Sequence, residues 1–357
     1  MATISGIRGM LLEEAILYLL RVSGYRTVEQ ADPHDTTLTG NCYSGLKVSG
    51  RGGVHQIDAI ADMAIATPFT YAQRLLVEAK CYADTTPVRI EIVRNAVGVL
   101  KDVGEYWVTR DGLPAKARFH YLYALFSASE YTKEAEKYAY AHDIYLIPLA
   151  HSQFIQPIIK AIRNINSQTF DHATNDRIDI SMTALRSGVR ANIRDTNDHQ
   201  LSEILADSRD ALAALRDFCG TCRRVNAALI AMIAGRFPIF LVPNPSLNLN
   251  QIQNDHIVSI HWNREKREKG WYLRSRSTGE LLFSFDLPLD VFKYYAEQNV
   301  LSPAHALNLK EDVLSEIQAI VTSDNFIRII RFRLDREWLS NVRSRIDNIQ
   351  SASAKIR

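Results

Sequence analysis

The chain of 357 residues has little cysteine, no long apolar run and almost no net charge. Its longest apolar run, residues 225–234, is interrupted by Asn226 and is shorter than the ~20 residues that span a bilayer. The N-terminus lacks the basic, apolar and small-residue regions of a signal peptide. We therefore expect a cytoplasmic protein that does not enter a membrane.

Cysteine is scarce, and its four positions fit a reducing compartment. Cys219 and Cys222 form a lone CxxC without a second cysteine or histidine pair at zinc-finger spacing. A structural zinc ion would need ligands from elsewhere, such as His199 or His256. We favour two buried or half-buried thiols over a zinc or redox site.

The charges nearly cancel, because 42 basic residues face 40 acidic ones, for a net charge of +2. This excludes the overall basicity that typifies many nucleic-acid-binding proteins. A nucleic-acid site in this chain must therefore concentrate its positive charge in a cleft. The hydrophobic content of 46% and the charged content of 23% are ordinary for a soluble globular protein, and the length suits two domains.

The most informative segment present is Leu-Leu-Val-Glu-Ala-Lys-Cys-Tyr at residues 75–82. Its apolar start predicts a buried strand that delivers Glu78 and Lys80 to its end, on the same side. Asp58 follows a glycine-rich turn and lies within an apolar run that would pair with this strand as a hairpin. An isolated Glu-x-Lys is common on solvated surfaces. Two carboxylates and an ammonium at a strand end, however, suit a hard cation beside a phosphodiester, so the segment predicts a metal-dependent nuclease.

Four blocks in this order carry a family resemblance. They are Gly-Met-Leu-Leu-Glu to Gly-Tyr at residues 9–25, Gly-Val-His-Gln-Ile-Asp at 53–58, Val-Glu-Ala-Lys at 77–80, and a strand-helix-strand pattern at 122–147. Together, residues 9–149 resemble the PD-(D/E)xK nuclease superfamily and, within it, the Mrr-like restriction endonuclease catalytic domain. The rest of the chain resembles no family that we can name.

Two positions depart from that family pattern or leave it ambiguous. Many Mrr-like members have a second glycine before the aspartate, where this chain has His55-Gln56-Ile57. We interpret His55 as a subfamily marker, with a structural residue at a turn as the alternative. The helix glutamate is either Glu13 or Glu14, and the register of the apolar residues around them favours Glu13.

The resemblance implies the roles of the site residues. Asp58, Glu78 and Lys80 would be catalytic. Asp58, Glu78 and the backbone carbonyl of Ala79 would bind Mg²⁺, for which Mn²⁺ would substitute, and Glu13 would add a ligand directly or through water. Lys80 would orient or deprotonate the attacking water, or hold the phosphate. The expected supporting residues are His55, Gln56, Arg94 and Asn95, with a solvated helix flank as the alternative for Arg94.

The element pattern predicts an α/β protein in two parts. Residues 1–160 would form a restriction-endonuclease-like core, with a central mixed β-sheet flanked by helices. A polar stretch at 161–200 predicts a linker. Residues 201–357 would form an α+β domain for DNA recognition, sensing or partner docking, with an early helical pair broken at Gly220 and a helix at 313–322.

A basic and aromatic cluster in the second part suggests contact with nucleic acid. Residues 261–276 contain six basic and three aromatic side chains, which suit phosphates and exposed bases respectively. A charged hairpin tip is the alternative, because Glu265 and Glu268 neutralise part of the charge. The candidate nucleic-acid-binding residues are Arg264, Lys266, Arg267, Lys269, Arg274 and Arg276.

Together these patterns favour a Mg²⁺-dependent DNA endonuclease, acting in restriction or antiphage defence. A homodimer is expected, because double-strand cleavage needs two active sites. A partner ATPase, helicase or other defence protein stays open, as does the choice among duplex DNA, single-stranded DNA and RNA. The alternatives are a nucleic-acid-binding or sensor protein with a gated or degenerate nuclease fold, and a repair nuclease that recognises DNA structure.

Overall fold

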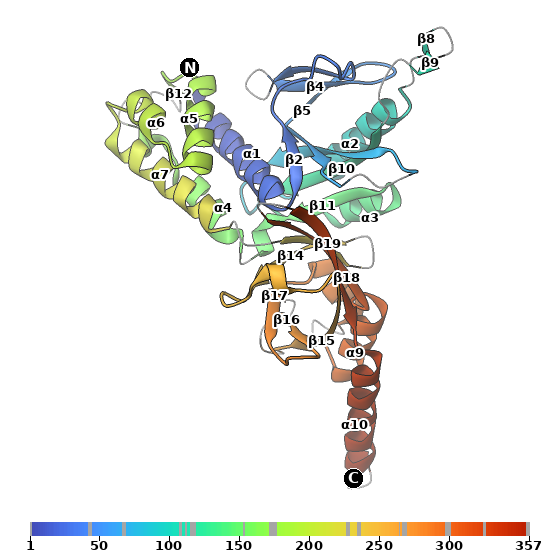
Figure 1. The fold of residues 1–357 in the computed structure, drawn as a ribbon. Coiled ribbons are helices and arrows are strands. Elements are labelled where there is room, and N and C mark those ends of the chain that lie inside the picture. The colour runs from blue at the N-terminus through green and yellow to red at the C-terminus, as the bar shows by residue number, and fades with distance from the viewer. Residues whose placement is uncertain are drawn as a thin grey trace. The chain divides into compact units, whose positions relative to one another are not determined.

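A five-stranded mixed sheet forms the centre of the N-terminal part in the computed structural model of the chain (Figure 1). The strand order is β11-β10-β7-β6-β2, and β7 runs parallel to β10 but antiparallel to β6. These strands are β2 (Tyr25–Val28), β6 (Ala59–Met63), β7 (Ala72–Lys80), β10 (Phe119–Ser127) and β11 (Ile144–Pro148). The structure describes residues 2–41, 45–65, 69–106, 109–110, 113–114, 119–152, 154–170, 177–225, 229–233, 237–263, 265, 270–296, 301–323 and 326–354.

Helices pack against this sheet and complete the layered arrangement. α1 (Ile4–Val22) contacts β2, β6 and β7, while α2 (Ile90–Gly104) contacts β10 and α3 (Lys133–Ala141) contacts β11. The side chain of Thr3 caps α1 by accepting a hydrogen bond from the Gly6 amide. The expected α/β class, with a central mixed sheet, is therefore confirmed. Among the described residues, no helix combines the length and apolarity needed to cross a bilayer.

A second, three-stranded sheet lies in the chain between β2 and β6 of the central one. It consists of β3 (Leu38–Asn41), β4 (Gly45–Ser49) and β5 (Val54–Ile57), all antiparallel. Val48 and Ile57 from this sheet join the same apolar core as Ile60 and Leu76 of the central sheet. The apolar run around Asp58, expected to form one strand of a hairpin, is thus divided between β5 and β6, which belong to different sheets.

The expected linker at 161–200 is not a linker. Most of its described residues lie in α4 (Gln156–Asn164), α5 (Met182–Asp195) and the start of α6 (His199–Ile204), and α5 packs on α1. Apolar residues at helical spacing, Leu185, Val189 and Ile193, are buried and hold α5 in place. The chain divides into residues 1–226 and 227–357, so the boundary at 201 was also wrong.

The long helix α7 (Arg209–Arg224) passes through Gly220 without a break, so the break predicted there was wrong. The interruption lies earlier, between α6 and α7. Cys219 and Cys222 lie three residues apart on α7 and are both buried, as expected. Burial raises the pKa of the Cys219 thiol to about 12 and raises that of Cys222 as well.

The second unit, residues 227–357, contains a closed seven-stranded barrel. Trp271, Phe283 and Phe332 are fully buried in its core. Its strands are β13 (Leu229–Ile233), β14 (Phe237–Pro243), β15 (Asp255–Trp262), β16 (Trp271–Ser275), β17 (Leu281–Phe285), β18 (Glu316–Ser323) and β19 (Phe326–Leu334), accompanied by α8 (Leu289–Tyr295), α9 (Pro303–Asp312) and α10 (Arg336–Ala354).

The helix predicted at 313–322 is instead the barrel strand β18, because Ile317, Ala319 and Val321 alternate into the core with a period of two. The remaining described elements are short two-stranded sheets and 3₁₀ turns. They are β1 (Ala2–Thr3) paired with β12 (Arg177–Ile178), β8 (Thr109–Arg110) paired with β9 (Leu113–Pro114), and the 3₁₀ turns η1 (Leu149–His151), η2 (Ser167–Thr169) and η3 (Leu249–Gln251).

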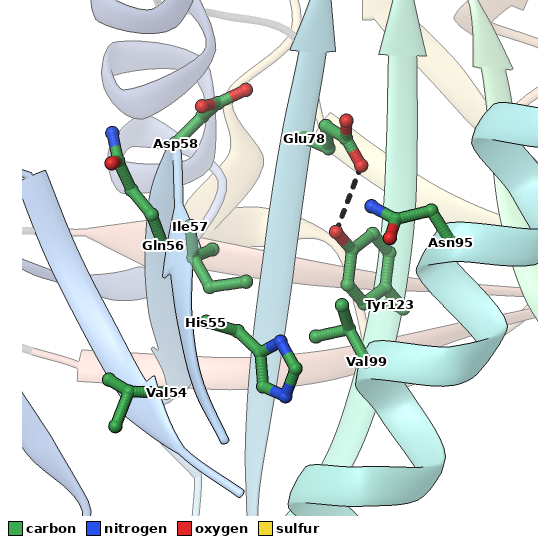
Figure 2. A pocket seen from close by; sticks show the side chains of 9 residues that line it. All are labelled: Val54, His55, Gln56, Ile57, Asp58, Glu78, Asn95, Val99 and Tyr123. Carbon is green, nitrogen blue, oxygen red and sulfur yellow. Dashed lines mark hydrogen bonds between the residues drawn. The ribbon is translucent and has the colours of Figure 1, made fainter. Parts of the chain in front are cut away.

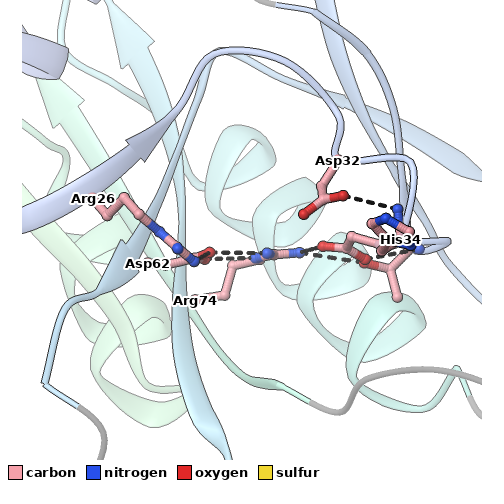
Figure 3. A network of polar contacts seen from close by, with 7 residues as sticks. Arg26, Asp32, His34, Asp62 and Arg74 are labelled. Atoms are coloured by element: carbon pink, nitrogen blue, oxygen red, sulfur yellow. Dashed lines mark hydrogen bonds and ion pairs between the residues drawn. The ribbon is translucent and has the colours of Figure 1, made fainter.

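A buried ion network ties the loop before β3 to the central sheet (Figure 3). Arg74 of β7 faces Asp62 of β6 and donates two hydrogen bonds to it, of 2.7 and 3.0 Å. The same guanidinium donates to Asp35 at 2.6 Å. Burial alone would raise the pKa of Asp35, but hydrogen bonds from Thr37 and Arg74 hold it below its ordinary value. The network is therefore charged and satisfied, with a structural role.

Candidate active site

Asp58 lies at the point where the chain leaves the three-stranded sheet and enters the central one. Its Oδ2 accepts a hydrogen bond of 2.9 Å from the backbone amide of Ala79, at the end of β7. The β6–β7 register pairs Ala59 with Val77, so Asp58 and Glu78 follow one step further at the same end of the sheet. Burial raises the pKa of Asp58 above its ordinary value, despite the Ala79 bond and the charge of Lys80.

The two charged side chains of β7 face the same space, as their spacing predicted. Three buried residues, Leu75 to Val77, precede them, so the charges end a core strand. Lys80 Nζ lies 2.5 Å from Glu78 Oε1, and both side chains keep some exposure. Burial would lower the pKa of Lys80, but its bond to Glu78 and the charges of Glu78 and Asp58 raise it, so the amine is an ammonium.

Asp58 and Glu78 line a pocket of about 240 Å³, which Figure 2 shows from close by. Tyr123 of β10 reaches into it and donates a hydrogen bond of 3.0 Å from its hydroxyl to Glu78 Oε2. Glu78 therefore has one oxygen on Lys80 and the other on Tyr123. The lining residues are Val54, His55, Gln56, Ile57, Asp58, Glu78, Asn95, Val99 and Tyr123.

The structure distinguishes the two adjacent glutamates of α1. Glu14 is almost fully buried, and Arg190 of α5 donates to both of its oxygens, at 2.8 and 2.6 Å. Glu13 keeps some exposure, and the negative charge of Asp58 acts on it electrostatically. Burial, with smaller contributions from Asp58 and Glu14, raises the pKa of Glu13 to about 7, although Arg186 acts to lower it. Glu13 is thus the glutamate on the site side, as the register favoured.

His55 lines the pocket but is also fixed from outside it. Its Nε2 lies 2.7 Å from Asp102 Oδ2, on α2, and the other oxygen of Asp102 accepts from the Gly52 amide at 2.7 Å. A Cβ atom at Gly50 would lie 2.0 Å from Asp102, so the glycine-rich turn leaves the space that this carboxylate occupies. His55 therefore joins the turn to α2, which accords with the structural interpretation of this residue.

The other expected supporting residues separate into two groups. Gln56 and Asn95 line the pocket, and Figure 2 shows the Asn95 amide pointing from α2 toward Glu78 and Tyr123. Arg94 does not line it. Its guanidinium lies 5.7 Å from the centre of the Tyr138 ring on α3, because successive residues of a helix point in different directions. The solvated-flank alternative for Arg94 holds.

The basic cluster of the second unit is only partly described. Arg274 donates to the Gly279 carbonyl at 3.0 Å and lies over the Tyr272 ring, while Arg276 pairs with Asp335 at 2.6 Å. Both arginines thus make contacts within their own domain, as in the charged-hairpin alternative. Arg264, Lys266, Arg267 and Lys269 lie outside the described residues.

Sequence reasoning missed three residues at the site. Tyr123 was assigned only to an apolar strand, Asp102 lies on the far end of α2, and Arg186 lies in the supposed linker. Arg186 Nη2 contacts Glu13 Oε2 at 2.6 Å. Only the pairing of parallel strands could have indicated Tyr123 beforehand.

In the described part of the chain, no group of three or more His, Cys, Asp or Glu side chains is already arranged to bind a metal ion.

Comparison with known proteins adds no functional assignment. No family model matches the sequence, and no curated protein matches it. A solved structure described as the crystal structure of a protein of unknown function, AF1548, aligns with a TM-score of 0.36 and 16% identity. The alignment covers 59% of this chain and 98% of that chain. So low a TM-score supports no conclusion about fold or activity.

Proposed function

We propose that the chain is a metal-dependent DNA endonuclease and that its central sheet with α1, α2 and α3 is a restriction-endonuclease-like core. The observation that carries this proposal is the meeting of Asp58, Glu78 and Lys80 at one end of two paired strands. Asp58 accepts a hydrogen bond from the Ala79 amide, and Lys80 pairs with Glu78. All three charged side chains therefore meet at residues 78–80, the end of β7. Structural stability does not require three charged side chains together at the end of a core strand.

The carboxylates fit a hard divalent cation. Asp58 uses one oxygen on the Ala79 amide, and Glu78 uses its two oxygens on Lys80 and Tyr123. A carboxylate has about four acceptor sites, so both residues retain lone pairs for a metal. Burial disfavours the negative charge of Asp58 and raises its pKa, and a bound cation would relieve that cost. Asp58, Glu78 and the Ala79 carbonyl would hold Mg²⁺ or Mn²⁺.

When bound, the metal ion would supply positive charge beside the scissile phosphate and make a water acidic enough to attack. The residues of the chain would do the rest. Lys80, as an ammonium, has only donors, so it would hold a phosphate oxygen or orient the attacking water. Tyr123 would fix the orientation of Glu78, and Asn95 would offer an amide toward the same space. The product would be a hydrolysed phosphodiester bond.

Cleavage of supercoiled plasmid, methylated and unmethylated, tests the proposal. The wild type is compared with Asp58→Asn and Lys80→Met, each with Mg²⁺, with Mn²⁺ and with EDTA. We expect metal-dependent nicking or linearisation that both substitutions reduce by at least about 100-fold. Single-stranded DNA and RNA of the same sequence serve as further substrates.

Arg94→Ala is the matched control, because Arg94 lies on α2 near the pocket but contacts Tyr138 instead. Its activity should equal that of the wild type. Cleavage that survives in Asp58→Asn would place the chemistry elsewhere. No cleavage of any substrate, together with tight plasmid binding that neither substitution alters, would contradict the enzyme and favour a nucleic-acid-binding protein. Two active sites are needed to cut both strands, so a homodimer is part of the proposal.

A further inference from the structure

Helix α5 brings an arginine to the third carboxylate of the site. Arg186 Nη2 lies 2.6 Å from Glu13 Oε2, and its Nη1 lies 3.5 Å from Glu14 Oε1. The guanidinium is largely buried, with 13% of its side chain exposed. Such a pair, removed from water and hydrogen-bonded, holds its partners in place more firmly than a surface ion pair.

One turn along α5, Arg190 shows what a purely structural pair looks like. It donates to both oxygens of Glu14, and both side chains are buried. Because Arg190 already holds both oxygens of Glu14, the closer contact of Arg186 is with Glu13. Arg186 thus binds Glu13 at 2.6 Å and reaches Glu14 only at 3.5 Å.

Glu13, Asp58 and Arg186 form one electrostatic group. The negative charge of Asp58 helps to raise the pKa of Glu13, and the positive charge of Arg186 acts to lower the pKa of Asp58. The guanidinium thus lies directly on Glu13 and within electrostatic range of Asp58. It supplies to these two carboxylates a positive charge that a second cation would otherwise provide.

Resting on the proposed function, we propose that Arg186 takes the place of a second metal ion. It binds Glu13 and keeps that carboxylate from acting as a metal ligand, so the site accepts one divalent cation, held by Asp58 and Glu78. Arg186 is a positioning residue in this arrangement, acting through Glu13.

The formal charges agree with a single ion. When Glu13, Asp58 and Glu78 are all ionised, they face two fixed cations, Lys80 and Arg186, which leaves one negative charge. One divalent ion would change this to one positive charge, which suits a phosphodiester anion. Without Arg186 the same group carries two negative charges and a free Glu13, which favours a second ion.

Counting bound Mn²⁺ on the full chain without DNA tests this inference, by electron paramagnetic resonance of free Mn²⁺ and by calorimetry. We expect one ion per chain in the wild type and two in Arg186→Ala. Arg186→Gln, which keeps a neutral donor at this position, provides a second variant if the alanine substitution unfolds the chain. Glu13→Gln added to either variant should restore one ion.

Two controls separate charge from stability. Arg186→Lys keeps a cation and should keep one ion. Arg194→Ala removes another ion pair of α5, with Glu29, and should also keep one ion. A count of one in both Arg186→Ala and Arg186→Gln, or of two in the wild type, would overturn the inference and leave the proposed nuclease standing. No Mn²⁺ on the wild type would overturn the metal site itself, and the inference with it.

Discussion

The hydroxyl of Tyr123, on β10, donates a hydrogen bond to Glu78 Oε2 on the neighbouring strand β7, at 3.0 Å. The ring is buried, so the hydroxyl is held by packing and has little freedom to turn elsewhere. The bond crosses two parallel strands and fixes one carboxylate oxygen, while Lys80 engages the other. The acidic side chain at the centre of the proposed site is thus oriented before any ligand binds.

Removing this hydroxyl should weaken metal binding without unfolding the protein. We expect Tyr123→Phe to reduce Mg²⁺ affinity, measured as the metal concentration for half-maximal cleavage, by roughly 10- to 100-fold, because ligand-orienting partners typically contribute that much. Tyr138→Phe, on α3 outside the pocket, should leave the metal titration unchanged. An unaltered titration in Tyr123→Phe would mean that Glu78 does not need this bond or is not a ligand.

The glycine-rich turn before β5 should tolerate no side chain at Gly50. Its Cβ atom would lie 2.0 Å from Asp102 Oδ2, so Gly50→Ala must displace the carboxylate that holds His55. We expect a loss of about 1–3 kcal/mol in unfolding free energy, measured by chemical denaturation. Gly98→Ala is the control, since its Cβ meets no atom within 4 Å in α2, and it should be neutral or stabilising by up to ~1 kcal/mol. Equal stability of the two variants would contradict the packing described.

Breaking the buried ion network should cost far more than removing its exposed member. Arg74→Met leaves the buried Asp62 without its main partner, and we expect a loss of about 3–5 kcal/mol in unfolding free energy. Arg26 pairs with the same carboxylate, at 3.3 Å, but 78% of its side chain is exposed, so Arg26→Met should cost less than about 1 kcal/mol. Similar losses in the two variants would show that the network is not buried as described.

Lys310 should make the unfolding free energy of the second unit increase as the pH rises from about 8 to 10.5. Its side chain is buried beneath Trp338, 5.2 Å from the ring centre, and burial lowers its pKa from 10.5 to about 8. Between these values the unfolded chain binds the proton and the folded chain does not, so the contribution of Lys310 to the unfolding free energy rises with pH. Below about pH 8 the folded chain bears the cost of burying the ammonium.

Lys310→Met should therefore stabilise the protein at neutral pH, by on the order of 1–2 kcal/mol after loss of the cation–π contact. The difference from the wild type should shrink as the pH approaches 10.5. Denaturant unfolding at a series of pH values measures it. Lys293→Met, on the exposed face of α8, should give a difference that does not vary with pH. A constant difference for Lys310→Met as well would mean that the amine is solvated.

Local patterns were sufficient to predict the end of β7 and the charged residues beside it. The apolar run before Glu78 and the two-residue spacing to Lys80 fixed the strand, its end and the shared direction of the two side chains, because these depend on backbone geometry alone. The pairing of Asp58 with the end of β7 followed from hairpin distance. The choice of Glu13 over Glu14 needed only the helical register of α1.

Long-range contacts explain what the sequence did not reveal. Arg186 and Glu13 are separated by 173 residues in the sequence. The buried apolar residues of α5 are spaced along a mostly polar segment, so this segment was interpreted as a linker. The barrel closes through the parallel pairing of Asp255 with Arg331 across β15 and β19, which no local pattern specifies. In β18 a short alternation of apolar residues was mistaken for part of a helical face, because over so few residues the two periods give similar patterns.

Closure of the barrel limits how the second unit can recruit another chain. Each of its seven strands has a neighbour on both sides, so within the described residues the barrel presents no edge on which an extended peptide could add a strand. The central sheet of the first unit, by contrast, ends on β2 and β11, each paired on one side only within that sheet. Any partner that associates by strand addition to one of these two sheets is therefore restricted to β2 or β11, whereas the barrel must be recognised through its side chains.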